Sequence, residues 1–119
     1  MIYITHITGS VAFISPLPIL KVGEIIGAKL FGGLQFTGLE KGYFDEIPGV
    51  IISGGILGLQ ISIRQQYEDY NKDGTDYILE VVPIHIIRGD DGCSSCSLNL
   101  YLKSLFEKTF KDNKDVMPR

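Results

Sequence analysis

Two strand-like runs on either side of a short polar segment limit the folds open to this chain more than any other feature. Residues 57–68 alternate apolar and polar side chains over much of their length, and residues 77–87 are rich in β-branched side chains. Both patterns favour β-strands, and Asp73-Gly74 between them is typical of a tight turn. The sequence therefore predicts an antiparallel β-hairpin.

A hairpin centred on Asp73 and Gly74 also predicts a register, in which Ile61 lies opposite Ile86. One face is then uniformly apolar and is expected to join the core. This face holds Leu59, Ile61, Ile63, Val82, Ile84 and Ile86. Because Pro83 cannot donate a ladder hydrogen bond, the second strand is predicted to lie at a sheet edge or at a bulge.

The rest of the chain reads as further short strands and one clear helix. Strands are expected at residues 2–8, 11–15, 34–39 and 50–53. Residues 19–31 stay ambiguous, because apolar side chains recur at helical spacing while two glycines lower helix propensity by up to about 1 kcal/mol each. A helix is predicted over about residues 95–111. Its apolar stripe comprises Leu98, Tyr101, Leu102, Leu105, Phe106 and Phe110.

These elements predict an α+β fold, with a mostly antiparallel β-sheet and a C-terminal amphipathic helix packed on one face. The length of 119 residues fits a single domain over residues 1–119, and the polar run 112–119 suggests a flexible tail. Two uncharged stretches, 2–20 and 47–63, contain prolines or several glycines and show no signal-peptide pattern. The chain is therefore expected to be soluble and cytoplasmic, without a membrane partner.

The charge balance bears on the kind of partner. Lys and Arg number 11 against 14 Asp and Glu, for a net charge of −3, and the basic residues are scattered along the chain. Nucleic-acid binding usually needs basic residues clustered in a patch or stripe, so no nucleic-acid partner is expected.

Residues 69–80 match the spacing of a calcium-binding loop. Asp69, Asn71 and Asp73 would supply side-chain oxygens and Glu80 a bidentate carboxylate, the ligands a hard cation prefers. The helix–loop–helix form needs helices on both sides, whereas strands are predicted here. The segment more closely resembles the calcium loops that join β-strands, although those come in arrays and this chain has one copy. A plain β-turn explains the same letters, so calcium binding is an alternative hypothesis.

Cys93-Ser-Ser-Cys96 is a second chemical candidate, predicted to follow a strand and precede the C-terminal helix. It resembles a thioredoxin-type Cys-x-x-Cys, in which helix N-terminal amides favour the thiolate. The resemblance implies a thiol-redox function for Cys93 and Cys96. The alternative is two reduced structural cysteines. No catalytic constellation stands out elsewhere, and the chain is expected not to be an enzyme.

The predicted hairpin tip and the segment before the helix gather acidic and aromatic side chains. These are Tyr67, Asp69, Tyr70, Asp73, Asp76, Tyr77, Asp90 and Asp91. Carboxylates steer association and tyrosines supply contact area, so the natural complement is a basic protein. Small acidic inhibitors of toxic enzymes, including bacterial immunity proteins against nuclease toxins, share this general character. The expected function is therefore a non-catalytic inhibitor or immunity-type protein that neutralises a basic partner such as a toxin domain.

Overall fold

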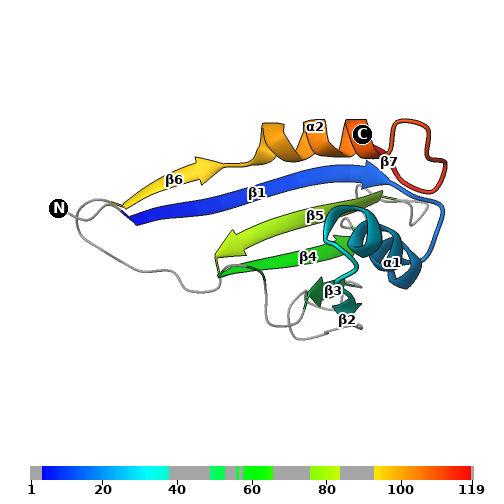
Figure 1. Ribbon diagram of the computed structural model, residues 1–119, viewed down its shortest axis with the longest axis horizontal. Helices are drawn as coiled ribbons and strands as arrows, with labels where there is room; N and C mark the ends of the chain where they lie inside the picture. The colour runs from blue at the N-terminus through cyan, green and yellow to red at the C-terminus, as the bar shows by residue number, and fades with distance from the viewer. Residues whose placement is uncertain are drawn as a thin grey trace.

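Seven strands and two helices make up the part of the chain that the structure describes (Figure 1). The computed structural model describes residues 4–37, 49–52, 56, 58–65, 76–83 and 93–118. In chain order the elements are β1 (Ile4–Ile14), α1 (Ile19–Leu30), β2 (Phe36–Thr37), β3 (Gly49–Ile52), β4 (Leu59–Gln65), β5 (Asp76–Pro83), β6 (Cys93–Ser97), α2 (Asn99–Thr109) and β7 (Met117–Pro118). The predicted α+β fold, with a mostly antiparallel sheet and a C-terminal helix, is confirmed.

β1 organises the sheet. The strand order is β2-β3-β4-β5-β1-β6, and β7 also pairs with β1. Residues 4–8 of β1 pair in parallel with β6, whereas residues 9–14 pair antiparallel with β5. In Figure 1 the β1–β6 pair therefore extends well beyond the ends of β4 and β5. One strand thus links two differently paired halves of the sheet.

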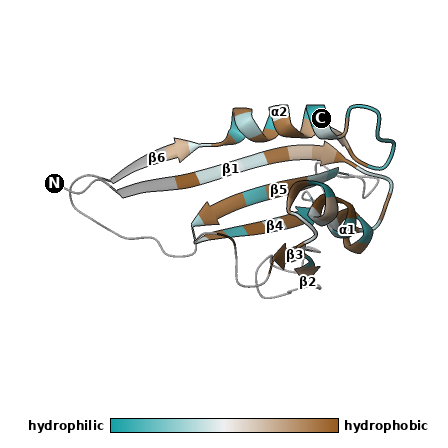
Figure 2. Cartoon of the chain, viewed as in Figure 1, coloured by the Kyte–Doolittle hydropathy of each residue, from teal (hydrophilic) through white to brown (hydrophobic). Residues whose placement is uncertain are grey.

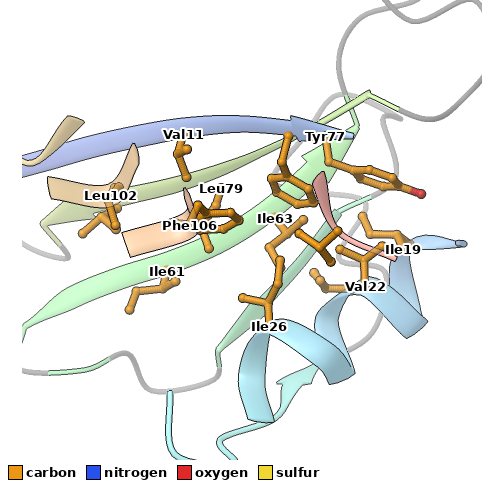
Figure 3. Packing of buried hydrophobic residues seen from close by; sticks show 14 of the residues in the cluster. Val11, Ile19, Val22, Ile26, Ile61, Ile63, Tyr77, Leu79, Leu102 and Phe106 are labelled. Carbon is orange, nitrogen blue, oxygen red and sulfur yellow. The ribbon is translucent and has the colours of Figure 1, made fainter. Parts of the chain in front are cut away.

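Both helices pack on the same face of the sheet. α1 contacts β2, β3 and β4, and α2 contacts β1 and β7. The buried cluster beneath them takes alternate residues from the strands, as the side-chain period of a strand requires. It consists of Val11, Phe13, Ile19, Val22, Ile26, Val50, Ile52, Ile61, Ile63, Tyr77, Leu79, Val81, Leu102, Phe106, Phe110 and Val116. Figure 3 shows side chains from both helices meeting those of β4 and β5, and Figure 2 shows apolar and polar residues alternating along β4.

α1 forms despite its two glycines because both sit where the helix lies closest to its neighbours. A Cβ atom at Gly23 would lie 3.2 Å from the Cβ of Phe36. A Cβ atom at Gly27 would collide with the carbonyl oxygen of Leu34. The close packing offsets the low helix propensity of glycine, which resolves the ambiguity of this segment in favour of a helix.

The predicted register of the hairpin is wrong. β4 and β5 are antiparallel neighbours, but Ile61 pairs with Val81 instead of Ile86. The shift from 86 to 81 is an odd number of residues, so β5 turns its other set of side chains toward the core. The buried side chains of β5 are Tyr77, Leu79 and Val81. Val82, which was predicted in the core, is 37% exposed, while Ile84 and Ile86 lie outside the described residues.

Of the two alternatives predicted for Pro83, the edge strand is wrong and the bulge stays a prediction. β5 runs between β4 and β1, and Pro83 is its last residue, paired with Leu59. The described pairing with β1 begins at Val81, so Pro83 has a described neighbour on the β4 side alone. The missing N–H of proline thus coincides with the end of the strand.

α2 is shorter than predicted, because β6 takes up the residues before it. Leu102 and Phe106 are buried as expected, whereas Leu105 is partly exposed and Tyr101 is 62% exposed. Neither described helix is long and apolar enough to span a membrane.

The segment after α2, predicted from its polarity to be a flexible tail over residues 112–119, contains a turn and the short strand β7. The Asn113 side-chain oxygen accepts hydrogen bonds from the backbone N–H groups of Asp115 and Val116, at 2.7 and 3.1 Å. This turn directs Val116 into the core, where it is fully buried, and Met117 then pairs with Ile14 of β1. One apolar residue and two strand residues are sufficient to dock the segment.

Candidate interaction surface

Most residues predicted to contact a partner or a cation lie outside the described ranges. This applies to Tyr67, Asp69, Tyr70, Asn71, Asp73, Asp90 and Asp91. In the sequence Asp69, Asn71 and Asp73 fall between Gln65, the last described residue of β4, and Asp76, the first of β5. Within the described ranges, no group of three or more His, Cys, Asp or Glu side chains could hold a metal ion. Calcium binding by residues 69–80 stays an alternative hypothesis beside the plain turn.

Tyr77 lies in the core and not on a partner-binding tip. Its side chain is 1% exposed, and its ring stacks on Phe13 with the centroids 5.6 Å apart. The phenol donates a hydrogen bond to the carbonyl oxygen of Leu17 at 2.6 Å. Burial raises the pKa of Tyr77, and a hydrogen bond with Gln65 opposes the rise. The prediction that Tyr77 supplies contact area for a partner is therefore wrong. The register of β5 turns this side chain toward the core instead.

Cys93 and Cys96 belong to β6 and not to a turn before the helix. β6 pairs Cys93 with Ile4 and Cys96 with Ile7, and α2 begins only at Asn99. Residues three positions apart in a strand are about 10 Å apart, whereas a disulfide needs Cα atoms within about 7 Å. The thioredoxin-like placement is therefore corrected. Cys96 is an exposed free thiol.

The second face of the sheet carries a mixed surface built from the alternate strand residues. The strand register arranges these residues in rows across the sheet. The rows are Met117, Ile14 and Asp76; Ala12, Ile78 and Arg64; and Ser10, Glu80, Ser62, Ile51 and Thr37. No described helix lies over this face, and its isoleucines are only partly buried. We call this set of residues the second face.

An ion pair lies at the centre of the second face. Arg64 Nε donates to Glu80 Oε1 at 2.6 Å across the β4–β5 pair, and the two side chains are 19% and 30% exposed. Such partial burial lessens solvent screening, so the pair is worth more than a fully exposed one. Glu80 would be the bidentate ligand in the helix–loop–helix form of the calcium motif, but the flanking segments are strands and Glu80 lies in mid-strand beside a guanidinium.

The second face continues over the edge of β1 toward the start of α2. There the backbone N–H of Ser10 donates to the Asn99 side-chain oxygen at 2.9 Å, and the N–H of Leu98 donates to the carbonyl of Thr8 at 2.8 Å. A shallow hollow of about 260 Å³ follows this edge. It is lined by Ser10, Val11, Ala12, Asn99, Leu100 and Lys103. Leu100 is 82% exposed, which leaves a large apolar side chain at the margin of the second face.

The sequence contained a signal for this surface that the turn-centred register obscured. Glu80 interrupts the apolar run of β5, and a charged residue in a strand usually marks the face away from the core. Placing Glu80 outward sends Leu79 and Val81 inward, as observed. The exposure of Leu100 also has a signal in the sequence, because it lies two residues from Leu98 and from Leu102 and therefore on the side of the helix opposite the apolar stripe.

These features define an α+β domain in which the two helices cover one face of the sheet. The other face is mixed, and its apolar side chains are partly exposed on either side of an ion pair. Comparison with protein-family models, with curated proteins and with solved structures finds no match to the chain.

Proposed function

We propose that the chain is a non-catalytic protein-binding domain of inhibitor or immunity type, which acts in the cytoplasm and neutralises a basic protein such as a toxin domain. The second face, which includes Asp76, forms the docking surface. The observation that carries this proposal is the combination of partly buried apolar side chains and carboxylates on one sheet face. Apolar area anchors a partner, and carboxylates select a basic one.

The charges of the second face support a basic partner over an acidic one. Among its described strand residues are two carboxylates, Asp76 and Glu80, and one guanidinium, Arg64. In the sequence Asp69 and Asp73 precede Asp76, whereas Asp90 and Asp91 precede β6, which pairs with Ile4 at the opposite end of β1 from the Ile14–Asp76 pair. Such an excess of negative charge raises the association rate of a positive partner at low salt.

The proposal is tested by capturing the partner and then measuring the kinetics. The purified chain is used as bait in extract from its native host, and bound proteins are identified by mass spectrometry. A variant with Asp69, Asp73, Asp76, Asp90 and Asp91 all replaced by Asn is compared with it. A basic protein should be enriched by the wild type, and its association rate with the variant should be lower and less dependent on salt.

A matched control removes carboxylates elsewhere. Glu107, Asp112 and Asp115 are exposed around α2 and the turn after it, so their replacement by Gln or Asn should leave association almost unchanged. Met117 belongs to the second face, and Val82 lies two residues beyond Glu80 on the same side of β5. Both are exposed, so replacing them with Arg should repel the basic partner. Equal association rates for the wild type, the five-residue variant and the Arg variant would contradict the proposal.

A further inference from the structure

A groove on the opposite, helical side of the molecule suggests a second interaction site. We propose that the groove between α1 and residues 33–36 binds an extended segment of another protein that presents an apolar side chain next to a lysine or arginine. The inference goes beyond the proposed function, since the two surfaces lie on different sides of the sheet.

The groove has one helical wall and one extended wall. It measures about 350 Å³. Leu20, Glu24 and Ala28, spaced four residues apart, form the wall on α1. The opposite wall consists of Gly33, Leu34, Gln35 and Phe36. Ala28 and Gly33 have little or no side chain, which leaves the space between the walls unfilled.

Backbone contacts fix the distance between the two walls. The N–H of Gly33 donates to the carbonyl oxygen of Gly27 at 2.9 Å, and the N–H of Leu34 donates to the carbonyl oxygen of Phe31 at 3.1 Å. Gly32 and Gly33 have φ angles of +63° and +91°, a left-handed conformation that ends the helix in a tight turn. The shape of the groove is therefore set before any ligand arrives, which reduces the entropy lost on binding.

The apolar part of the occupant follows from two leucines. Leu20 is 52% exposed and Leu34 is 48% exposed, one on each wall. Phe36 also lines the groove, is partly buried against the core, and makes an edge contact with Phe31, at 6.0 Å and 71°. An apolar side chain placed between the leucines would remove both from water, at roughly 25 cal/mol per Å² of apolar area.

The charged part follows from Glu24, which is the charged residue of the lining. Its carboxylate lies 3.5 Å from Lys21 Nζ on the same helix, and the side chains are 64% and 70% exposed for Lys21 and Glu24. Exposed pairs of this kind contribute little, so a cation on the partner can replace Lys21. Because the leucines stay half exposed, the groove is too open to enclose a free small molecule, which favours a chain segment.

The test uses two capped tetrapeptides, Gly-Phe-Lys-Gly and Gly-Phe-Glu-Gly, added to the isotope-labelled chain. Backbone amide shifts should map the lysine peptide to residues 20–36, with a dissociation constant about fivefold lower than that of the glutamate peptide. Glu24→Gln should remove the difference between the peptides, whereas Glu107→Gln on the exposed side of α2 should preserve it. Leu34→Ser should weaken the binding of both peptides. If Leu34→Ser does not fold, as judged by a poorly dispersed spectrum, Leu20→Ser replaces it in the test.

Several results would overturn the proposal. These are the absence of shifts in residues 20–36, equal affinity for the two peptides, and a lysine preference that survives Glu24→Gln. Equal shifts from 2-phenylethylammonium alone would identify a free organic cation as the ligand and would also reject the protein segment. The test needs no native partner, so it stands whether or not the second face binds a basic protein.

Discussion

At the scale of single residues, Tyr77 shows how a polar group can be kept inside a core. Its ring is buried against Phe13, while its hydroxyl reaches the backbone carbonyl of Leu17 just before α1. The bond ties β5 to the entrance of the first helix. A buried phenol without a partner would cost about 1–3 kcal/mol, so the contact stabilises both elements.

Tyr77→Phe should lower the free energy of unfolding by about 1 kcal/mol at neutral pH, because the hydroxyl–carbonyl bond is lost and the ring is kept. The pKa of Tyr77 is raised in the folded state by burial, so the phenol ionises more easily in the unfolded chain. Its contribution is therefore complete below about pH 10 and is lost as pH rises through the folded pKa. Urea unfolding of both proteins from pH 7 to 11 should show the wild type losing its advantage above pH 10. Parallel pH profiles would contradict this role.

At the scale of elements, the β4–β5 pair shows what the sequence can and cannot predict. Antiparallel pairing of the two runs follows from their β-branched and alternating residues. The register does not, because both parities of β5 offer apolar side chains. The Asp73-Gly74 signal pairs residues whose numbers sum to 147, whereas the observed pairs, such as Ile61 with Val81, sum to 142. In α1, propensity opposed the helix and tertiary packing of Gly27 against Leu34 decided the outcome. Tyr77 was predicted to contact a partner, and this was wrong for the same reason: the observed register turns Tyr77, Leu79 and Val81 toward the core.

Two adjacent substitutions in β5 distinguish the observed register from the turn-centred one. Val81→Asp places a carboxylate among core residues and should lower stability by more than about 3 kcal/mol or unfold the domain. Val82→Asp, at a position 37% exposed, should cost about 1 kcal/mol or less, mainly through the low strand propensity of Asp. Thermal and urea unfolding followed by circular dichroism measure both. The reverse ranking would support the register centred on Asp73 and Gly74.

At the scale of the whole molecule, the segment after α2 helps to close the core. Phe110 and Val116 are buried at either end of the turn that Asn113 organises. β6 pairs with residues 4–8 of β1, and β7 pairs with Phe13 and Ile14. Between them the backbone N–H of Ser10 donates to the Asn99 side chain, so α2 and the two short strands all contact β1.

Ending the chain after Asp115 should destabilise the domain by about 2 kcal/mol, because the burial of Val116 and the β1–β7 pairing are lost. Lys114→Ala combined with Asp115→Ala is the control, since both side chains are exposed. The midpoint of urea unfolding should fall for the shortened chain and stay nearly constant for the double variant. An unchanged midpoint after shortening would mean that residues 116–119 add nothing to the fold.

The position of β1 also has a consequence for the order in which the protein can fold during its synthesis. Val11 pairs with Leu79, Ile7 with Cys96 and Phe13 with Pro118, so the first strand waits for partners that the ribosome makes much later. At synthesis rates of about 5–20 residues per second, β1 spends several seconds without its neighbours. During that interval its apolar residues and unpaired backbone are exposed to other chains, and a holding chaperone would protect this segment more than any other strand.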